Sequence, residues 1–300
     1  MHVKEKYLGV PLYYSFVVFG LCLVGIVVGS FCDWQISAAF SNPKSLTLEY
    51  WALLFYTWLF SAAGVLFYLS FRKEKKGLGI FLLVLSVIYN GYQLGTWLAK
   101  QYLLVWPDNT GLANGIGYLT SALAACLEAF LVYFFLKKDS YKTYMLRVAI
   151  VIFVVAVFSE LIGTFLKGFI SRPRYRNIVA EGSALAYSPW WKFHFWTSSA
   201  DAVRSCPSGH MIATTLIMVL PLFHPLWKYT FKGGEYLAFG ISVAIVILVG
   251  TFRIYNGAHF LSDVSFVILI TYATLWLADY FFFHQKGNEE RELIQIKAAD

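Results

Sequence analysis

The chain has 300 residues, of which 59% are hydrophobic and only 14% are charged. A typical soluble domain carries about 25% charged residues, so this composition excludes an ordinary water-soluble protein and indicates an integral membrane protein. The net charge of +7 does not indicate binding to nucleic acid, because Lys and Arg form short clusters between apolar segments instead of one basic surface.

Eight apolar segments follow one another along the chain, and we expect each to form a transmembrane helix. Most of them reach the roughly 20 residues that a helix needs to cross a bilayer. The segments cover residues 10–32, 50–71, 77–103, 112–136, 144–169, 210–227, 235–252 and 259–283. The predicted fold class is therefore all-α, a polytopic membrane helical bundle of about eight transmembrane helices.

The charged connectors between the segments predict the orientation of the chain. Basic stretches precede the first segment and follow the second and the fourth, and the tail 285–300 is also charged. Because Lys and Arg are enriched in cytoplasmic loops, we expect a multi-pass protein of the plasma membrane with both termini in the cytoplasm. The connector 170–209 then faces the exterior, where its several arginines suggest an anionic partner.

Two features of the exterior face leave alternatives open. The aromatic run "SPWWKFHFW" at 188–196 is expected to lie on the lipid headgroups as a hairpin or a short helix, with contact to a lipid substrate as the second interpretation. Cys32 and Cys206 are predicted at the same face, where two free thiols are favoured over a disulfide.

Three polar clusters interrupt the apolar second half of the chain, and the predicted topology places all of them at the exterior end of the bundle. Such convergence of side chains from separate helices builds a site in a helical bundle. The clusters cover residues 167–176, 206–210 and 252–263. Their basic side chains, which suit the oxygens of a phosphate group, include Lys167, Arg174 and Arg253.

Ser208 and Gly209 lie where the sixth apolar segment begins. Free backbone N–H groups at a helix N-terminus favour an anion, and glycine lets that anion approach closely. Ser208 could also be a simple N-cap, and the two roles are compatible. Together with the three basic side chains, these two residues form the predicted phosphate-binding site.

Two histidines supply the predicted catalytic groups. His259 and Asp263 are four residues apart, which places them on one face of a helix. A carboxylate bonded to one imidazole nitrogen fixes the tautomer and leaves the other nitrogen as a nucleophile. His210 is then the proton donor for the leaving oxygen. The basic side chains stabilise the transition state, so neither a metal nor another cofactor is expected.

These residues resemble the three motifs of the type 2 phosphatidic acid phosphatase family, which shares a core with vanadium haloperoxidases and glucose-6-phosphatase. The first motif is Lys, six residues and Arg; the second is Pro-Ser-Gly-His at 207–210; the third is Arg, five residues, His, three residues and Asp. The sequence departs from the family at Tyr175, where the family has proline, and at Phe252, where it has serine. The resemblance covers roughly residues 145–280.

The resemblance implies the same roles for the residues at the matching positions. It assigns His259 as nucleophile, His210 as acid and base, and Asp263 as the group that orients His259. The residues that it assigns to phosphate binding are Lys167, Arg174, Ser208, Gly209 and Arg253. It also implies a six-helix phosphatase-type core, so that two of the eight segments are additions near the N-terminus.

The expected organisation is an N-terminal set of helices at 1–143, a catalytic core at 144–284 and a cytoplasmic tail at 285–300. We expect the protein to hydrolyse a lipid phosphate or diphosphate, foremost a polyprenyl diphosphate such as undecaprenyl diphosphate. Phosphatidic acid or phosphatidylglycerol phosphate is the alternative substrate, and transfer to an acceptor other than water is an alternative reaction. An anion or lipid transporter is the alternative of a different class. Besides the lipid and the bilayer, no nucleic acid and no obligate protein partner is expected.

Overall fold

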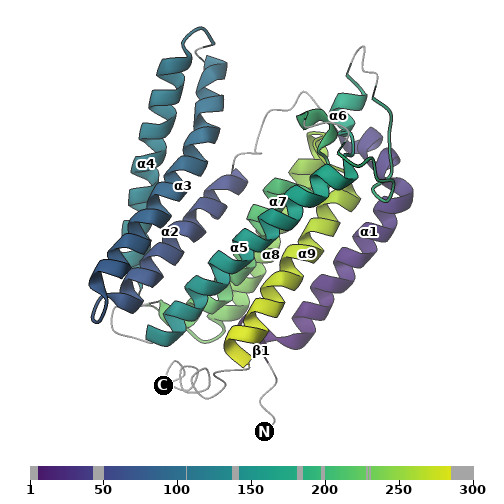
Figure 1. Ribbon diagram of the computed structural model, residues 1–300. Helices are drawn as coiled ribbons and strands as arrows, with labels where there is room; N and C mark the ends of the chain where they lie inside the picture. The colour runs from purple at the N-terminus through teal and green to yellow at the C-terminus, as the bar shows by residue number, and fades with distance from the viewer. Residues whose placement is uncertain are drawn as a thin grey trace. The chain divides into compact units, whose positions relative to one another are not determined.

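The computed structural model describes residues 6–42, 51–105, 107–136, 142–180, 185–196, 200–227, 229 and 231–284. Within these residues the protein is mainly helical, with one short antiparallel strand pair, β1 (Lys6–Tyr7) and β2 (Val10–Pro11) (Figure 1). The long helices are α1 (Leu12–Phe40), α2 (Trp51–Phe71), α3 (Lys76–Val105), α4 (Thr110–Phe135), α5 (Lys142–Ile170), α8 (Gly234–Tyr255) and α9 (Leu261–Asp279). The shorter ones are α6 (Tyr175–Ile178), η1 (Asp201–Val203), α7 (Gly209–Thr215), η2 (Leu216–Leu226) and η3 (Tyr280–His284).

The helices agree with the expected transmembrane segments. In the described part of the chain, seven helices are long and apolar enough to cross a membrane, and α2 adds a shorter apolar stretch at Trp58–Phe71. Each of the eight predicted segments is helical, so the all-α polytopic fold is confirmed. The predicted tail 285–300 lies outside the described residues.

The sixth segment departs from a regular α-helix. It begins as α7 and continues from Leu216 as the 3₁₀ helix η2, which contains Pro221 and Pro225. Proline lacks a backbone N–H and its ring clashes with the carbonyl four residues earlier. The two prolines therefore account for the change of helix type after the first two turns.

Large apolar side chains remain exposed along several helices, as expected for surfaces that face lipid. Phe16 and Phe31 on α1 are 64% and 77% exposed, and Leu123 on α4 is 64% exposed. A helix that is apolar on all sides is typical of a membrane span. Ser15, Asp33 and Ser37 of α1 are instead buried.

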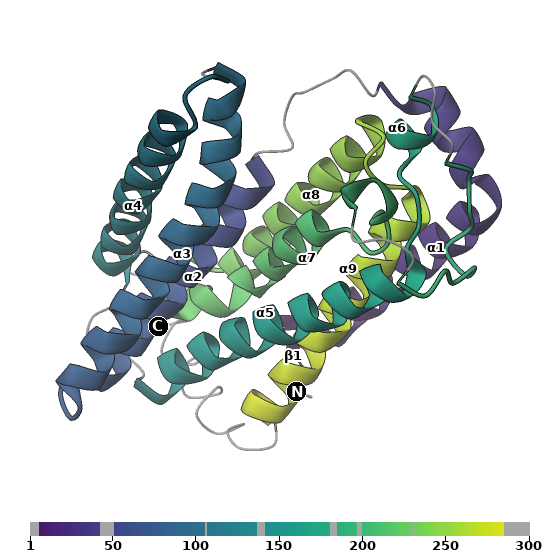
Figure 2. The ribbon, with the colours of Figure 1, turned by 45° about the horizontal axis from the view of Figure 1, so that its top comes forward.

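The chain divides into two compact units, each made of several stretches. The first unit comprises Met1–Ala52, Val155–Met218 and Phe239–Leu277, and the second comprises Leu53–Val154, Val219–Ala238 and Ala278–Asp300. In the second unit, α3 and α4 lie side by side (Figure 2). The first unit includes α1 together with the later helices, so each unit contains residues from both sides of residue 143. The expected domain boundary at that residue stays a prediction.

Within the first unit, α1 packs closely against the start of α9. A Cβ atom on Gly29 would lie 2.6 Å from the backbone nitrogen of Ser262, and a Cβ atom on Gly25 would clash with Ser265. Small residues spaced four apart let transmembrane helices approach each other in this way. Asp33 lies one turn beyond Gly29, so the same contact brings its carboxylate to the start of α9.

Candidate active site

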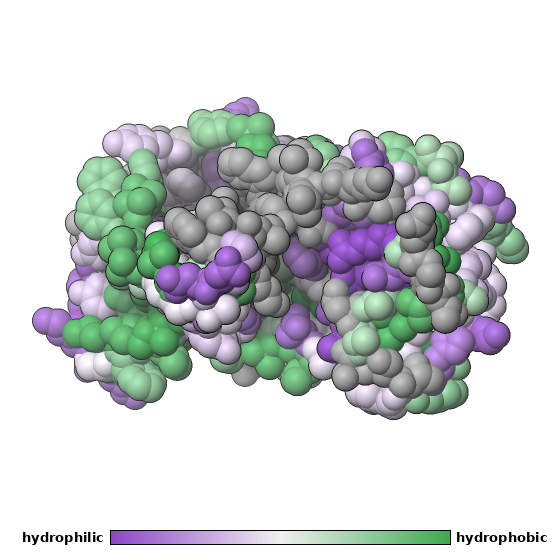
Figure 3. Space-filling model, turned by 90° about the horizontal axis from the view of Figure 1, so that it is seen from above, coloured by the Kyte–Doolittle hydropathy of each residue, from purple (hydrophilic) through white to green (hydrophobic). Residues whose placement is uncertain are grey.

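Backbone hydrogen bonds join the three loops that carry the predicted site residues. The loop after α5 meets the loop before α7, where the N–H of Ser205 donates to the carbonyl of Arg172 at 2.9 Å. The N–H of Arg176 donates to the carbonyl of Gly257, between α8 and α9, at 2.9 Å. All of these loops lie at one end of the first unit, near α6 (Figure 1). Seen from that end, strongly hydrophilic side chains gather in a hollow of the surface (Figure 3).

Lys167 and Gly209 are in direct proximity. A Cβ atom on Gly209 would lie 2.6 Å from Nζ of Lys167. The ammonium group of Lys167, on α5, therefore reaches the first residue of α7 because Gly209 has no side chain that would block it. The structure thus brings the first and second motifs together as the sequence predicts.

Ser208 precedes α7 at the N-cap position, but its side chain makes no capping hydrogen bond. Its hydroxyl oxygen is buried and has no hydrogen-bond partner in the part of the chain that the structure describes. A buried hydroxyl without a partner is costly. Ser208 therefore stands at the N-cap position, as one interpretation expects, but it does not cap the helix through its side chain, and the hydroxyl group remains able to bind a ligand next to Lys167.

The hydrogen bonds of His259 define its tautomer. Nδ1 lies 2.5 Å from the carbonyl oxygen of Ser205, and Nε2 lies 3.0 Å from Nη2 of Arg253. The carbonyl can only accept and the guanidinium can only donate. Nδ1 therefore carries the proton, and Nε2 carries a lone pair directed toward Arg253.

The neutral form of His259 is also favoured electrostatically. The ring is 1% exposed. Burial lowers the pKa of the His259 imidazole well below its usual range, and the positive charges of Arg253 and Arg174 lower this pKa further. The Ser205 carbonyl opposes this shift without outweighing it. His259 therefore presents a neutral imidazole, which is the form that can act as a nucleophile.

His210 lies among the same cations. The charges that act most strongly on its ring come from Arg253, Arg174 and Lys167. The side chain is half-buried, and its ring forms no hydrogen bond with any described residue. The three basic side chains that the sequence assigns to phosphate binding therefore lie close enough to act on the histidine that it assigns to proton transfer.

Asp263 does not contact His259 as the sequence analysis expects. Among the described residues, its carboxylate accepts hydrogen bonds from Arg172 at 2.6 Å, from the Ser205 hydroxyl at 2.5 Å and from the backbone N–H of Phe260 at 3.0 Å. The four-residue spacing is misleading because α9 begins at Leu261, so that His259 lies outside the helix. The Ser205 carbonyl accepts the hydrogen bond from His259 that the carboxylate was expected to accept. Asp263 is connected to His259 only through Ser205, whose hydroxyl it binds.

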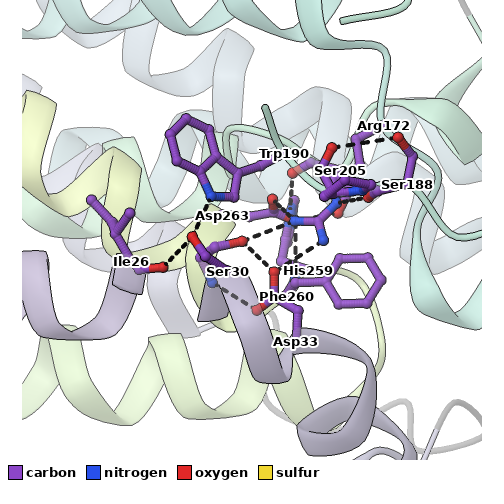
Figure 4. A network of polar contacts seen from close by, with 12 residues as sticks. Ile26, Ser30, Asp33, Arg172, Ser188, Trp190, Ser205, His259, Phe260 and Asp263 are labelled. Carbon is purple, nitrogen blue, oxygen red and sulfur yellow. Dashed lines mark hydrogen bonds and ion pairs between the residues drawn. The ribbon is translucent and has the colours of Figure 1, made fainter. Parts of the chain in front are cut away.

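The sequence analysis missed Arg172 and Asp33, which complete this network (Figure 4). The Arg172 guanidinium is fully buried and bridges Asp263 to Asp33. Its Nη2 lies 2.9 Å from Oδ2 of Asp33. It also lies over the ring of Phe260, with Cζ 4.0 Å from the centroid. Asp33 is the single charged residue in the sequence of α1, and an ionisable side chain in a membrane helix is a signal that could have found it.

The aromatic run is tied to the end of α5. The backbone N–H of Trp196 donates to the carbonyl of Gly168 at 2.8 Å, and Trp190 donates to the Ser30 hydroxyl at 2.9 Å. In the described stretch 185–196 the chain contains no helix and turns at 189–192, so the short helix is not formed, and the expected position on the lipid headgroups stays a prediction. The exposed aromatic side chains of this run are Trp191, Phe193, Phe195 and Trp196.

Cys32 and Cys206 are free thiols, as the sequence analysis favours. Cys206 is fully buried, and this burial raises the pKa of its thiol well above the usual range. Within the described residues, no group of three or more His, Cys, Asp and Glu side chains is placed to hold a metal ion. The expectation that catalysis needs no metal stays a prediction.

Residues 147–286 match the family model of the PAP2 superfamily. This segment, just under half of the chain, is therefore similar to the PAP2 superfamily. The PAP2 segment contains all the predicted site residues and Arg172, whereas Asp33 lies outside it. Together with the membrane-spanning helices, this match supports a membrane phosphatase of the PAP2 type. Comparison with curated proteins and with solved structures found no match.

Proposed function

We propose that the protein hydrolyses a phosphomonoester or diphosphate of a membrane lipid through a phosphohistidine intermediate. The observation that carries this proposal is the neutral His259 ring, whose Nε2 accepts a hydrogen bond from Nη2 of Arg253 at 3.0 Å. A phosphate group bound by that guanidinium brings its phosphorus atom close to Nε2.

The proposed phosphate site combines positive charge with a hydroxyl donor. Arg253 and Arg174 offer planar donors to phosphate oxygens, and Lys167 adds a point charge. The hydroxyl of Ser208, which has no partner among the described residues, donates to a further oxygen. Fixed donors of this kind stabilise the charge that develops in the transition state of phosphoryl transfer.

The reaction proceeds in two steps. In the first, Nε2 of His259 attacks phosphorus, the bond from phosphorus to the lipid oxygen breaks, and protonated His210 donates its proton to that oxygen. In the second, water attacks phosphorus, the phosphorus–nitrogen bond breaks, and His210 accepts the proton of the water. His259 keeps its proton on Nδ1, bonded to Ser205, throughout both steps.

The substrate that we favour is a polyprenyl diphosphate such as undecaprenyl diphosphate. This choice rests on the predicted exterior position of the site, because that carrier is recycled at the outer face of the bacterial membrane. Phosphatidic acid and phosphatidylglycerol phosphate have the same reacting group, and a phosphotransferase would use the same residues. The exposed aromatic run beside α5 supports a lipid over a soluble phosphate ester, since aromatic side chains are enriched at the membrane interface.

A panel of lipid phosphates tests the proposal with purified protein in detergent. Phosphate release is measured in the presence of a chelator for the wild type and for His259→Ala. We expect release from at least one lipid by the wild type and a loss of about 10⁴-fold or more in the variant, because the nucleophile is removed. Release that the variant retains would reject His259 as nucleophile. Absence of release from every lipid by the wild type would favour the anion or lipid transporter.

A further inference from the structure

Arg172 and two carboxylates form a charged cluster that is sealed inside the protein. The side chains of Arg172, Asp33 and Asp263 are each 0% exposed. Two of these residues belong to the PAP2 segment, and Asp33 comes from α1, 139 residues before Arg172. The catalytic steps proposed above do not use Asp33.

Both carboxylate oxygens of Asp33 act as acceptors. Oδ1 accepts the backbone N–H of Ser262 at 3.0 Å, and Oδ2 accepts Nη2 of Arg172 at 2.9 Å and the hydroxyl of Ser262. An asparagine at this position would have only one acceptor oxygen. Its NH₂ group would face either the N–H of Ser262 or the guanidinium of Arg172, both of which are donors. The site is therefore built for a carboxylate, and α1 is fixed by it to both Arg172 and the first turn of α9.

A continuous set of hydrogen bonds leads from Asp33 to His259 (Figure 4). Arg172 uses Nη2 for Asp33 and Nη1 for Asp263. Asp263 accepts the hydroxyl of Ser205 at 2.5 Å, and the carbonyl of that same residue accepts Nδ1–H of His259. Each member of the set therefore limits the position of the next.

Stability alone is a weak reason for such a cluster. Removing charges from water costs several kcal/mol per ion, and apolar residues of similar volume often stabilise a protein at least as well as a buried ion pair. What the cluster supplies instead is a defined position for Ser205, and hence for the imidazole ring. A shift of about 1 Å in a catalytic group can cost on the order of 100-fold in rate.

We propose that Asp33 is a positioning residue of the active site: α1, from outside the PAP2 segment, holds Arg172 against Asp263 and thereby fixes Ser205 and the ring of His259. The inference rests on the proposed function. It gives α1 a role in positioning the catalytic groups, although α1 lies outside the segment that matches the family model.

The test compares Asp33→Asn with Ser37→Ala in the full-length protein. Ser37 lies one turn further along the buried face of α1, and its hydroxyl has no hydrogen-bond partner among the described residues. For Asp33→Asn we expect kcat to fall about 10- to 100-fold while KM changes less than about threefold, because the phosphate-binding side chains stay in place. Ser37→Ala should keep both values. A wild-type kcat in folded Asp33→Asn would overturn the inference.

A double-mutant cycle separates positioning from a general loss of stability. If Asp33 acts through Ser205, the double variant Asp33→Asn/Ser205→Ala loses no more kcat than the more severe single variant, since both changes break the same set of bonds. A loss of kcat in the double variant that equals the product of the two single losses would overturn the inference. If Asp33→Asn does not fold, Ser262→Ala removes one bond to Asp33 and one to Arg172; it should lower kcat several-fold, and a wild-type kcat would again overturn the inference.

The wild type and His259→Ala are measured alongside these variants. An active wild type, an inactive His259→Ala and a fully active Asp33→Asn would reject the inference and leave the proposed function standing. A wild type that releases no phosphate would reject the proposed function and the inference with it.

Discussion

The active site has two sides that differ in how their polar groups are satisfied. On the supporting side, Ser205, Asp263 and Arg172 are buried and hydrogen-bonded to one another. On the phosphate side, beside Lys167, the buried hydroxyl of Ser208 has no partner among the described residues. The supporting side is therefore complete in the protein itself, whereas the proposed phosphate side keeps a buried hydroxyl that a ligand could bind. Substitutions on the two sides should therefore change different quantities.

The largest effect is expected for Arg172→Gln on the supporting side. This change leaves Asp33 and Asp263 buried without their shared cation, which should lower the free energy of unfolding by about 3–5 kcal/mol. Unfolding of the protein in detergent, followed by heating or by added denaturant, measures it. Lys192→Gln removes one positive charge from an exposed position and should leave the free energy of unfolding unchanged. An Arg172→Gln variant as stable as this control would contradict the supporting role.

Arg253→Lys should act on the rate instead of the stability. Lysine keeps the charge but not the planar fork, so the bond to Nε2 and the paired contact to phosphate are lost. We expect kcat to fall by about 100-fold, with a change in unfolding free energy of less than about 1 kcal/mol. Steady-state kinetics on the best lipid and thermal unfolding give both quantities. An Arg253→Lys variant that keeps its kcat but loses stability would place Arg253 on the supporting side and contradict the account.

Two serines offer a smaller and more closely matched comparison. Ser205→Ala removes a hydroxyl bonded to Asp263 and should cost about 1–3 kcal/mol of stability. Ser208→Ala removes a buried hydroxyl without a described partner, so stability should stay the same or rise slightly, while KM for the lipid increases several-fold. Melting temperatures and KM values of the two variants test this. Equal losses of stability would show that Ser208 belongs to the supporting side.

The smallest predicted effect is a shift along the pH axis. Because burial and the guanidinium groups lower the pKa of His259, the reactive neutral ring persists below pH 6.5, the usual value for histidine. The acid limb of kcat/KM should therefore lie below about pH 6.5. Arg174→Gln removes one of the charges that oppose protonation and should move this limb upward. An acid limb that does not move in Arg174→Gln would show that the charge of Arg174 does not lower the pKa of His259.

Much of the fold follows from the sequence because a membrane imposes simple rules. The apolar runs predict all eight helices, and their bounds differ from the structure by a few residues for most of them. Proline chemistry explains the irregular sixth helix, although the sequence pattern alone does not predict its 3₁₀ form. The motif spacings also predict which residues converge, because Lys167 meets Gly209 and Arg253 meets His259.

The parts that the sequence did not predict depend on contacts between distant residues. No local spacing relates Asp33 to Arg172, since the pair forms only when α1 packs on α9 through Gly25 and Gly29. The link from Asp263 to His259 was wrong in detail because it assumed that α9 begins before residue 259. In both cases a helix start or a helix contact decides which polar groups meet.

Trapping of the phosphorylated enzyme tests the central claim most directly. Protein quenched during turnover of a lipid labelled in its phosphoryl group should carry label that is stable to alkali and lost in acid, as expected for a phosphorus–nitrogen bond. The account predicts this label on His259 in the wild type and none on His259→Ala. Label on another residue, or an unchanged amount of label on His259→Ala, would contradict it.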